Sequence, residues 1–379
     1  MPYRLLYPAP HKKSALQTGE FEGSTGPRLE LPGMGYPEWP PRFPDELPAP
    51  ALSFSNVQVY ERCKRKWLLQ YLRDFVPRDI MFDIAIQRRL LPVTMLAGAI
   101  VDAVVKMAMR RYMSRREWRP DLKADARLAL NHFVEHSKLF TMAIDNREAW
   151  PKTKHTWIRP LDMIYYDGEI STLQQASTMS TVDACLTNFV DFMHAEDLYA
   201  ADPEGWRIPE SGDKPNPWFW SGEIPVYAGY DFAIVDGDDL RIIDWKAGRS
   251  ERAEFGARDQ LVWYATFGHD DWGFALDKIT LQAVWLQEGN KITRTTADPE
   301  NVEAMRNRWV GLHARQGQDI ADLRAAPARA DEFFPLTDDV MACYSCPFKS
   351  CVGRTRLQRM YPEVVAAEKR DVVDDEFLW

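Results

Sequence analysis

The sequence is poor in cysteine and has no long apolar run. Five cysteines among 379 residues are too few for a disulfide framework in a chain of this size. No apolar run approaches the roughly 20 residues that a helix needs to span a bilayer. The first residues, MPYRLLYPAPHKK, also lack the apolar core of a signal peptide. These absences predict a soluble cytoplasmic protein that does not bind membranes.

Two further absences narrow the possible functions. The phosphate-binding motif G-x-x-x-x-G-K-[ST] does not occur, so the chain has no recognisable P-loop motor. The net charge of -9 argues against a uniformly basic nucleic-acid binder. Basic residues are nevertheless clustered in RCKRK (62–66), RRYMSRREWR (110–119) and KSCVGRTRLQR (349–359). Each cluster suits either a phosphate backbone or an ordinary solvated helix face.

The composition predicts a folded protein with irregular ends. Hydrophobic residues make up 45% of the chain, including 14 Trp and 14 Tyr. Residues 1–50, rich in Pro and Gly, are expected to form an irregular arm. We interpret residues 51–379 as one domain, with a helical part to about residue 220, a mixed core to about 325, a cysteine region at about 335–360 and an acidic tail at 371–379. The tail is either disordered, packed as a helix, or a docking segment for a partner or for the basic surface.

Periodicity predicts helices before and after a group of strands. Ser55 and Gln58 form a capping-box pattern at the start of a helix over about 56–74, and a second helix is expected over about 94–113. Two β-rich runs, IPVYAGYDFAIV and LRIIDWK, then flank DGDD, whose Asp-Gly pair favours a tight hairpin.

The second half of the expected core alternates helix and strand. A helical pattern over about 252–267 precedes the strand pair KITLQAVWLQ and KITRTT. Asp298 and Pro299 then fit the cap and first turn of a helix that runs to about residue 324. The whole pattern predicts an α/β fold with a mixed sheet and flanking helices.

The stretch LRIIDWKAG, residues 240–248, places two charges at the end of an apolar run. Residues two apart on a strand point to the same face, so Asp244 and Lys246 are expected side by side. The hairpin would bring Asp231, in the preceding run, close to Asp244. Two neighbouring carboxylates suit Mg²⁺ or Mn²⁺, and a lysine there can position or deprotonate a water, or stabilise charge on phosphorus. A D-x-K triplet alone is a weak signal, because many strands end in surface charges.

In its context the sequence resembles the RecB-like branch of the PD-(D/E)XK nuclease superfamily, which includes CRISPR-associated exonucleases with an iron-sulfur cluster. The resemblance lies in GYD, IIDWKAG and DQLVWYA, where Gln260 and Tyr264 match the family's Q-x-x-x-Y. It implies a restriction-endonuclease-like fold with a large helical insertion and a cysteine-stapled region. It further implies that the catalytic set is Asp231, Asp244, Lys246, Gln260 and Tyr264, with Gln260 and Tyr264 facing the cleft and DNA.

The metal ligands implied by the resemblance are Asp231, Asp244, the main-chain carbonyl of Trp245 and a residue upstream. The family often has G-x-x-x-H upstream, and its histidine binds the metal. Here the stretch is GAIVD, residues 98–102, so Asp102 takes that place. An all-oxygen shell would favour Mg²⁺ or Mn²⁺ over softer metals. Alternatively, Asp102 is an ordinary polar residue of its helix.

The cysteines suggest a second metal site. The stretch CYSCPFKSC supplies Cys343, Cys346 and Cys351, one ligand short of a four-sulfur site. Related nucleases with a cluster have an earlier cysteine in a helix reading roughly C-P-R-K, and Cys63 matches it, with Lys64 in place of proline. The resemblance implies a 4Fe-4S cluster that staples the first helix to the C-terminal segment. Sulfur chemistry alone would equally allow zinc, and free thiols are the third possibility.

These patterns lead to a functional hypothesis with two alternatives. The chain is expected to be a Mg²⁺- or Mn²⁺-dependent deoxyribonuclease, an exonuclease that acts on DNA ends or single strands. The alternatives are a non-cleaving iron-sulfur subunit that binds DNA and a zinc-stapled endonuclease. DNA is the expected partner, and a helicase would have to unwind long duplexes because the chain lacks a P-loop.

Overall fold

The computed structural model describes residues 49–72, 78–116, 122–145, 159–199, 202–209, 218–251, 253–344, 346–363 and 365. Most of the expected arm (1–50), the acidic tail (371–379) and part of the basic segment 110–119 lie outside these ranges. Within them, no helix is both long and apolar enough to cross a membrane.

A five-stranded mixed sheet carries the D-x-K stretch. Its order is β2-β5-β6-β7-β8, with β2 (Trp206–Arg207), β5 (Phe232–Asp236), β6 (Asp239–Lys246), β7 (Ile279–Trp285) and β8 (Lys291–Thr296). β6 and β7 are parallel, and the other neighbours are antiparallel. Parallel strands need a long crossover, which contains α8 (Glu254–Asp270). The expected hairpin at DGDD and the strand pair KITLQAVWLQ and KITRTT are confirmed.

A smaller sheet has the order β1-β4-β3, with β1 (Leu52–Ser53), β3 (Trp218–Ser221) and β4 (Ile224–Tyr227). The run IPVYAGYDFAIV is therefore divided between β4 and β5, which belong to different sheets. Asp231 lies directly before β5, so its expected place inside the strand was wrong by one residue. The reason is the turn between the sheets, where the Tyr230 amide donates to the Ala228 carbonyl at 2.8 Å.

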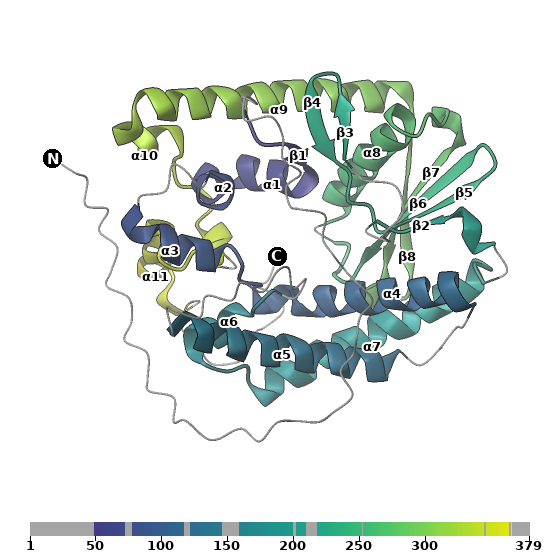
Figure 1. The fold of residues 1–379 in the computed structure, drawn as a ribbon, viewed down its shortest axis with the longest axis horizontal. Helices are drawn as coiled ribbons and strands as arrows, with labels where there is room; N and C mark the ends of the chain where they lie inside the picture. Colours follow the sequence, from purple (N-terminus) through teal and green to yellow (C-terminus); the bar gives the residue numbers. More distant parts are fainter. Residues whose placement is uncertain are drawn as a thin grey trace.

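Helices cover both faces of the five-stranded sheet (Figure 1). Ile242 of β6 packs into a core with residues of α8 and α9 (Pro299–Ala325), whereas Ile243 packs into a core with residues of α4 (Leu96–Arg115), α5 (Lys123–Asp145) and α7 (Thr172–Ala195). This alternation follows from the pleat of a strand buried on both faces. The expected fold class, a restriction-endonuclease-like mixed sheet flanked by helices, is confirmed.

The remaining helices are shorter. They are α1 (Phe54–Arg62), α2 (Lys64–Tyr71), α3 (Arg78–Gln87), α6 (Asp162–Asp167), α10 (Ala330–Phe333) and α11 (Val352–Met360). Short 3-10 helices are η2 (Val93–Met95), η4 (Pro203–Gly205), η5 (Leu276–Lys278), η6 (Leu286–Glu288), η7 (Pro327–Arg329) and η8 (Val340–Cys343).

The single helix expected over 56–74 is in fact two helices that meet at Cys63. The backbone of Cys63 is extended, with φ -157° and ψ 101°, so the residue ends α1 and caps α2. Its sulfur accepts from the Lys66 amide at 3.4 Å. The predicted cap was also wrong: Ser53, not Ser55, accepts from the Asn56 amide at 3.1 Å. In contrast, α9 begins after Asp298 as predicted, and Asp298 Oδ1 accepts from the Asn301 amide at 2.8 Å.

Candidate functional site

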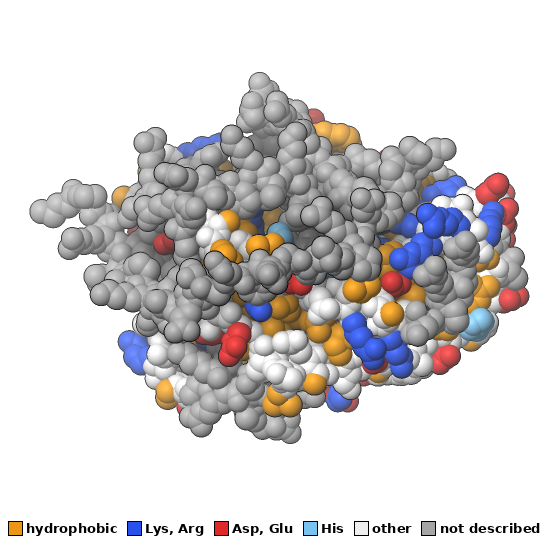
Figure 2. All heavy atoms as spheres, turned by 60° about the horizontal axis from the view of Figure 1, so that its bottom comes forward, with side chains coloured by type: hydrophobic (Ala, Val, Ile, Leu, Met, Phe, Trp, Pro, Cys, Tyr) orange, Lys and Arg blue, Asp and Glu red, His pale blue; other side chains and the backbone are white. Residues whose placement is uncertain are grey.

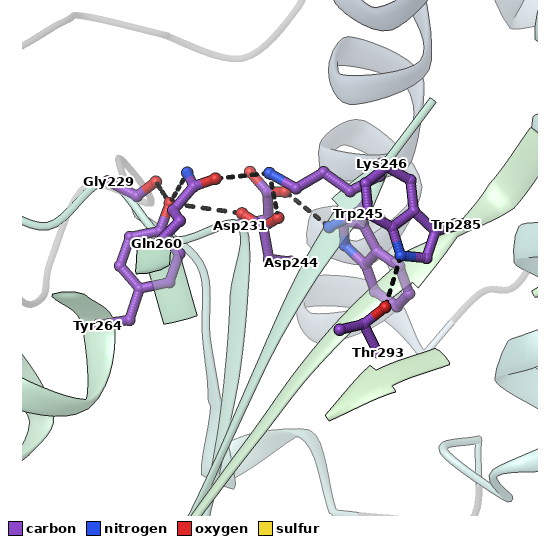
Figure 3. A network of polar contacts seen from close by, with 9 residues as sticks. All are labelled: Gly229, Asp231, Asp244, Trp245, Lys246, Gln260, Tyr264, Trp285 and Thr293. Carbon is purple, nitrogen blue, oxygen red and sulfur yellow. Dashed lines mark hydrogen bonds and ion pairs between the residues drawn. The ribbon is translucent and has the colours of Figure 1, made fainter. Parts of the chain in front are cut away.

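Asp244 and Lys246 lie on one face at the carboxyl end of β6 (Figure 3). Lys246 Nζ is 2.5 Å from Asp244 Oδ2, which confirms that the two side chains lie side by side. The Asp244 side chain is only 4% exposed and that of Lys246 is 23% exposed. Between them, Trp245 points to the opposite face and packs edge-on against Phe189 and Phe192. Strand alternation thus delivers both charges to one point and anchors the strand with the intervening indole.

Asp231 is the second carboxylate of this cluster. Its Oδ2 accepts from the Trp245 amide at 2.8 Å, because pairing of Phe232 with Ile243 sets the residue before β5 opposite the end of β6. Burial of the carboxyl group, and then the nearby charges of Asp244 and Asp102, raise the pKa of Asp231 to about 8. Two carboxylates so close together are costly without a cation to balance them.

Gln260 and Tyr264, one turn apart on α8, extend the cluster. Gln260 Oε1 accepts from Lys246 Nζ at 2.6 Å, and Gln260 Nε2 donates to the Tyr264 hydroxyl at 2.5 Å. That hydroxyl donates to the Gly229 carbonyl at 2.9 Å and lies 3.4 Å from Asp244 Oδ1. Burial, reinforced by Asp244 and Asp231, raises the pKa of Tyr264 well above its ordinary value. Tyr264 is therefore a neutral donor that links α8 to Gly229, in the turn between β4 and β5, and to Asp244 at the end of β6 (Figure 3).

Three residues of this network were not anticipated from the sequence. Gly229 supplies the acceptor for Tyr264, and a Cβ at Gly229 would lie 2.5 Å from Tyr227 Cε1. Trp285 is the register partner of Lys246 on β7, is fully buried, and donates from Nε1 to Thr293 Oγ1 at 3.0 Å. Gly229 belongs to the GYD stretch that carries the family resemblance, but no role was predicted for it. Trp285 and Thr293 had no signal in the sequence, because strand pairing sets Trp285 beside Lys246, and Thr293 contacts only the indole of Trp285 in this group.

Asp102 lies on α4, across from the end of β6. One turn earlier on α4, a Cβ at Gly98 would be 3.9 Å from the Cβ of Ala247, the residue after Lys246. The Asp102 side chain is 47% exposed, and its Oδ1 is 2.9 Å from Lys106 Nζ. Its charge raises the pKa of Asp231. Asp102 therefore lies close enough to Asp231 for its charge to act on that carboxylate.

The donor set fits a hard divalent cation. Within the described ranges, Asp244 Oδ2 is buried and accepts no hydrogen bond, although it forms the ion pair with Lys246. Burial, and then the charges of Asp244 and Asp102, raise the pKa of Asp231, so a bound cation would favour its ionised form. Carboxylate oxygens are the ligands that Mg²⁺ and Mn²⁺ prefer. No group of three or more His, Cys, Asp or Glu among the described residues is already arranged around a metal position.

The four candidate cysteines lie in one region away from β6. A Cβ at Gly353 would be 2.8 Å from Cys343 Sγ and 3.8 Å from Cys351 Sγ, so these two thiols border one point. Cys346 and Cys63 both act electrostatically on Cys343. Burial raises the pKa of Cys343 to about 11 and that of Cys351 to about 12. The thiols are free of disulfides, and the described residues contain no preformed metal cage.

The cysteine loop, defined as residues 343–351, also holds helices together. The Tyr166 hydroxyl of α6 donates to the Pro347 carbonyl at 2.9 Å. Ser350 Oγ donates to Gln87 Oε1 of α3 at 3.0 Å. Phe348 is buried in a small cluster with Leu69 of α2 and Ile84 of α3. This loop is therefore a junction between the first helices and the C-terminal segment.

Many basic side chains near the cysteine loop are already used within the protein. Lys64 Nζ is 2.6 Å from Asp319 Oδ2, and Arg62 forms a longer exposed pair with Asp339 at 3.4 Å. The buried Arg65 donates from Nε to the Phe334 carbonyl at 2.8 Å. Further Lys and Arg side chains gather at the right of the face shown in Figure 2. Basic surface is thus present, but RCKRK contributes partly to structure.

Comparison with known proteins identifies the family. The model of the PD-(D/E)XK nuclease superfamily matches residues 51–351, a range that contains β6, α8, the carboxylate pair and the cysteine loop. No curated protein sequence matches the chain. Members of this superfamily are typically nucleases and generally use divalent metals such as Mg²⁺. The geometry at the end of β6 and the family match agree, and the chain belongs to the PD-(D/E)XK nuclease superfamily.

Proposed function

We propose that the protein is a Mg²⁺- or Mn²⁺-dependent deoxyribonuclease that hydrolyses phosphodiester bonds. The observation that carries this proposal is the carboxylate pair of the buried Asp244 and the partly buried Asp231, with the ammonium of Lys246 only 2.5 Å from Asp244. In this assignment Asp231 and Asp244 hold the metal, and the Trp245 carbonyl and Asp102 are further ligands. A cation bound there would lower the pKa of a water and neutralise charge on the phosphate.

The protein's own groups would orient the phosphate and stabilise its charge. Lys246 donates to Gln260 at 2.6 Å, so its ammonium is fixed at the mouth of the carboxylate pair. An ammonium held there can stabilise the negative charge that builds on phosphorus as the bond breaks. Tyr264, kept neutral by burial, fixes Gln260 and the strand end through its hydroxyl. Catalysis would then depend on positioning that exists before substrate binds.

We further propose that the chain belongs to the RecB-like branch and that Cys63, Cys343, Cys346 and Cys351 hold a 4Fe-4S cluster. Support comes from the shared region of these thiols and from the donor set, since thiolates suit iron-sulfur clusters. Zinc is the alternative that the same ligands would accept. The domain organisation proposed is an N-terminal arm at 1–50 and one nuclease domain over 51–379.

Exonuclease activity on DNA ends or single strands in the cytoplasm is the preferred assignment, with a helicase as a candidate partner. The test is cleavage of end-labelled linear DNA, single-stranded and double-stranded, beside covalently closed circles with Mg²⁺ or Mn²⁺. Metal-dependent loss of linear DNA alone is expected. Cleavage of closed circles would instead indicate an endonuclease. Binding without cleavage on every substrate, by metal-replete protein, would favour the non-cleaving DNA-binding subunit.

Metal affinity is expected to rise with pH up to about 8. In the metal-free protein the pKa of Asp231 is raised to about 8, so its proton must leave when a cation binds. Affinity should therefore increase by up to about tenfold per pH unit below 8 and level off above it. Calorimetric titration of Mn²⁺ in buffers of different ionisation enthalpy measures both the affinity and the proton released.

The raised pKa of Asp231 also affects the free energy of unfolding of the metal-free protein. The folded-state pKa lies above the unfolded value, so between about pH 4 and 8 the folded protein holds a proton that the unfolded chain releases. The contribution of Asp231 to the free energy of unfolding of the metal-free protein therefore falls as pH rises through this range. Asp231→Asn should remove this pH dependence together with the proton release. If metal affinity in the wild type did not change with pH, the predicted release of a proton from Asp231 on metal binding would be wrong.

A further inference from the structure

Asp102 and Lys106 form an ion pair one turn apart on α4, beside the carboxylate pair. Lys106 Nζ lies 2.9 Å from Asp102 Oδ1 and 3.1 Å from Oδ2, so the ammonium contacts both carboxylate oxygens. The Lys106 side chain is 15% exposed, whereas that of Asp102 is 47% exposed. Lys106 is therefore the more buried side chain of the pair, as expected when the methylene groups of a lysine pack against the protein.

Both members of the pair act on the candidate metal site. The charge of Asp102 raises the pKa of Asp231, and the charge of Lys106 lowers it. The packing of α4 against the residue that follows Lys246 explains this proximity, because Gly98 faces Ala247 one turn before Asp102. The pair thus borders the site described above.

Charged residues reach the candidate metal site from the end of β6 and from α4. Asp231 and Asp244 come from the strand end, with Lys246 beside them, and Asp102 and Lys106 come from α4. The α8 residues that face this point, Gln260 and Tyr264, are neutral donors or acceptors. Asp102 pairs with Lys106, and Asp244 pairs with Lys246. Lys106 therefore balances a carboxylate that a divalent cation would otherwise attract.

We infer that Lys106 is a positioning residue that competes with the metal for Asp102. In the metal-free protein Lys106 holds the Asp102 carboxylate by both oxygens, and a divalent cation must draw this carboxylate away to gain a third carboxylate ligand. The inference rests on the proposed function, because it assigns a regulatory contact to the same metal site. Its consequence is that Lys106 sets the metal concentration at which the site fills.

The competing explanation is an ordinary helical ion pair. Charges four residues apart on a helix commonly stabilise the helix slightly and do nothing else. Breaking such a pair would leave metal affinity unchanged. A third possibility is that the charge of Lys106 simply repels the metal. In that case the effect of Lys106 on metal affinity would remain after Asp102 is neutralised, whereas competition for Asp102 would not.

The test is a double-mutant cycle read by Mn²⁺ binding, using electron paramagnetic resonance of free Mn²⁺, on the full chain. The variants are Lys106→Gln, Asp102→Asn and the double variant, with Arg258→Gln as control because Arg258 forms a similar pair with Glu254 on α8. Lys106→Gln is expected to tighten Mn²⁺ binding roughly three- to tenfold. Asp102→Asn should weaken binding, the double variant should match Asp102→Asn, and the control should match the wild type.

Three results would overturn the inference. The first is unchanged or weaker Mn²⁺ binding by Lys106→Gln. The second is tightening in Arg258→Gln equal to that in Lys106→Gln, and the third is equal tightening by Lys106→Gln with and without Asp102. Metal-dependent cleavage by the wild type together with any of them would overturn this inference alone. Failure of both wild type and Lys106→Gln to bind Mn²⁺ would overturn the proposed metal site as well.

Discussion

Replacing Lys246 with alanine is expected to reduce metal-dependent DNA cleavage by at least about 100-fold, the usual effect of removing one preorganised group that stabilises transition-state charge. The ammonium contacts Asp244 and Gln260 at 2.5 and 2.6 Å, so its loss removes the cation from the mouth of the site. The rate constant for cleavage at saturating DNA and metal is the measurement. It separates loss of catalysis from weaker binding.

The control for this substitution is Lys278→Ala. Lys278 forms an exposed pair with Asp239 at 3.3 Å, at the opposite end of β6, and its removal should leave the rate unchanged. Circular dichroism of both variants checks that the fold persists. A Lys246→Ala protein that is folded, binds Mn²⁺ and cleaves at the wild-type rate would exclude Lys246 from catalysis.

Replacing Cys346 with serine is expected to remove bound iron and to lower the free energy of unfolding by about 3 kcal/mol, in line with the loss of a cross-link that closes a long loop. The melting temperature should fall by roughly 5 °C. The physical reason is that Cys346 lies in the cysteine loop, which joins α2, α3 and α6 to the C-terminal segment. Iron and zinc content by elemental analysis, visible absorption and thermal unfolding measure the effect.

The matched control is Cys185→Ala. Cys185 is buried on α7, where its sulfur lies 3.9 Å from the Ala247 carbonyl, and burial raises its pKa to about 12. Its loss should leave the iron content unchanged. Zinc in place of iron in the wild type would favour the zinc alternative. Equal metal content and equal melting temperature in wild type and Cys346→Ser would remove the cluster proposal.

Much of the strand order could be predicted from the sequence because local signals marked it. Asp-Gly at residues 236–237 specified the β5–β6 hairpin, and Asp298 with Pro299 specified the start of α9. The expected secondary structure differs from the observed one where tertiary contacts outweigh the local periodicity. Cys63 continues the helical pattern of its neighbours, yet the chain is extended there.

For the same reason, only part of the candidate site could be predicted from the sequence. Alternation alone placed Asp244 beside Lys246, since it depends only on the strand. The partners of Tyr264, and the nearness of Lys106 to the carboxylate pair, depend on how the helices lie on the sheet. Lys106 was not anticipated, because nothing in the spacing of α4 shows that this helix packs against the residue after Lys246.

The sequence by itself determined the strand that presents Asp244 and Lys246, the hairpin before it and the helix that carries Gln260 and Tyr264, because each depends on contacts between residues close in the chain. Only the tertiary structure decided that Asp231 precedes β5, that α4 brings Asp102 and Lys106 to the carboxylates, and that Trp285 lies beside Lys246. Those arrangements depend on packing between distant segments, whose energies local patterns do not contain.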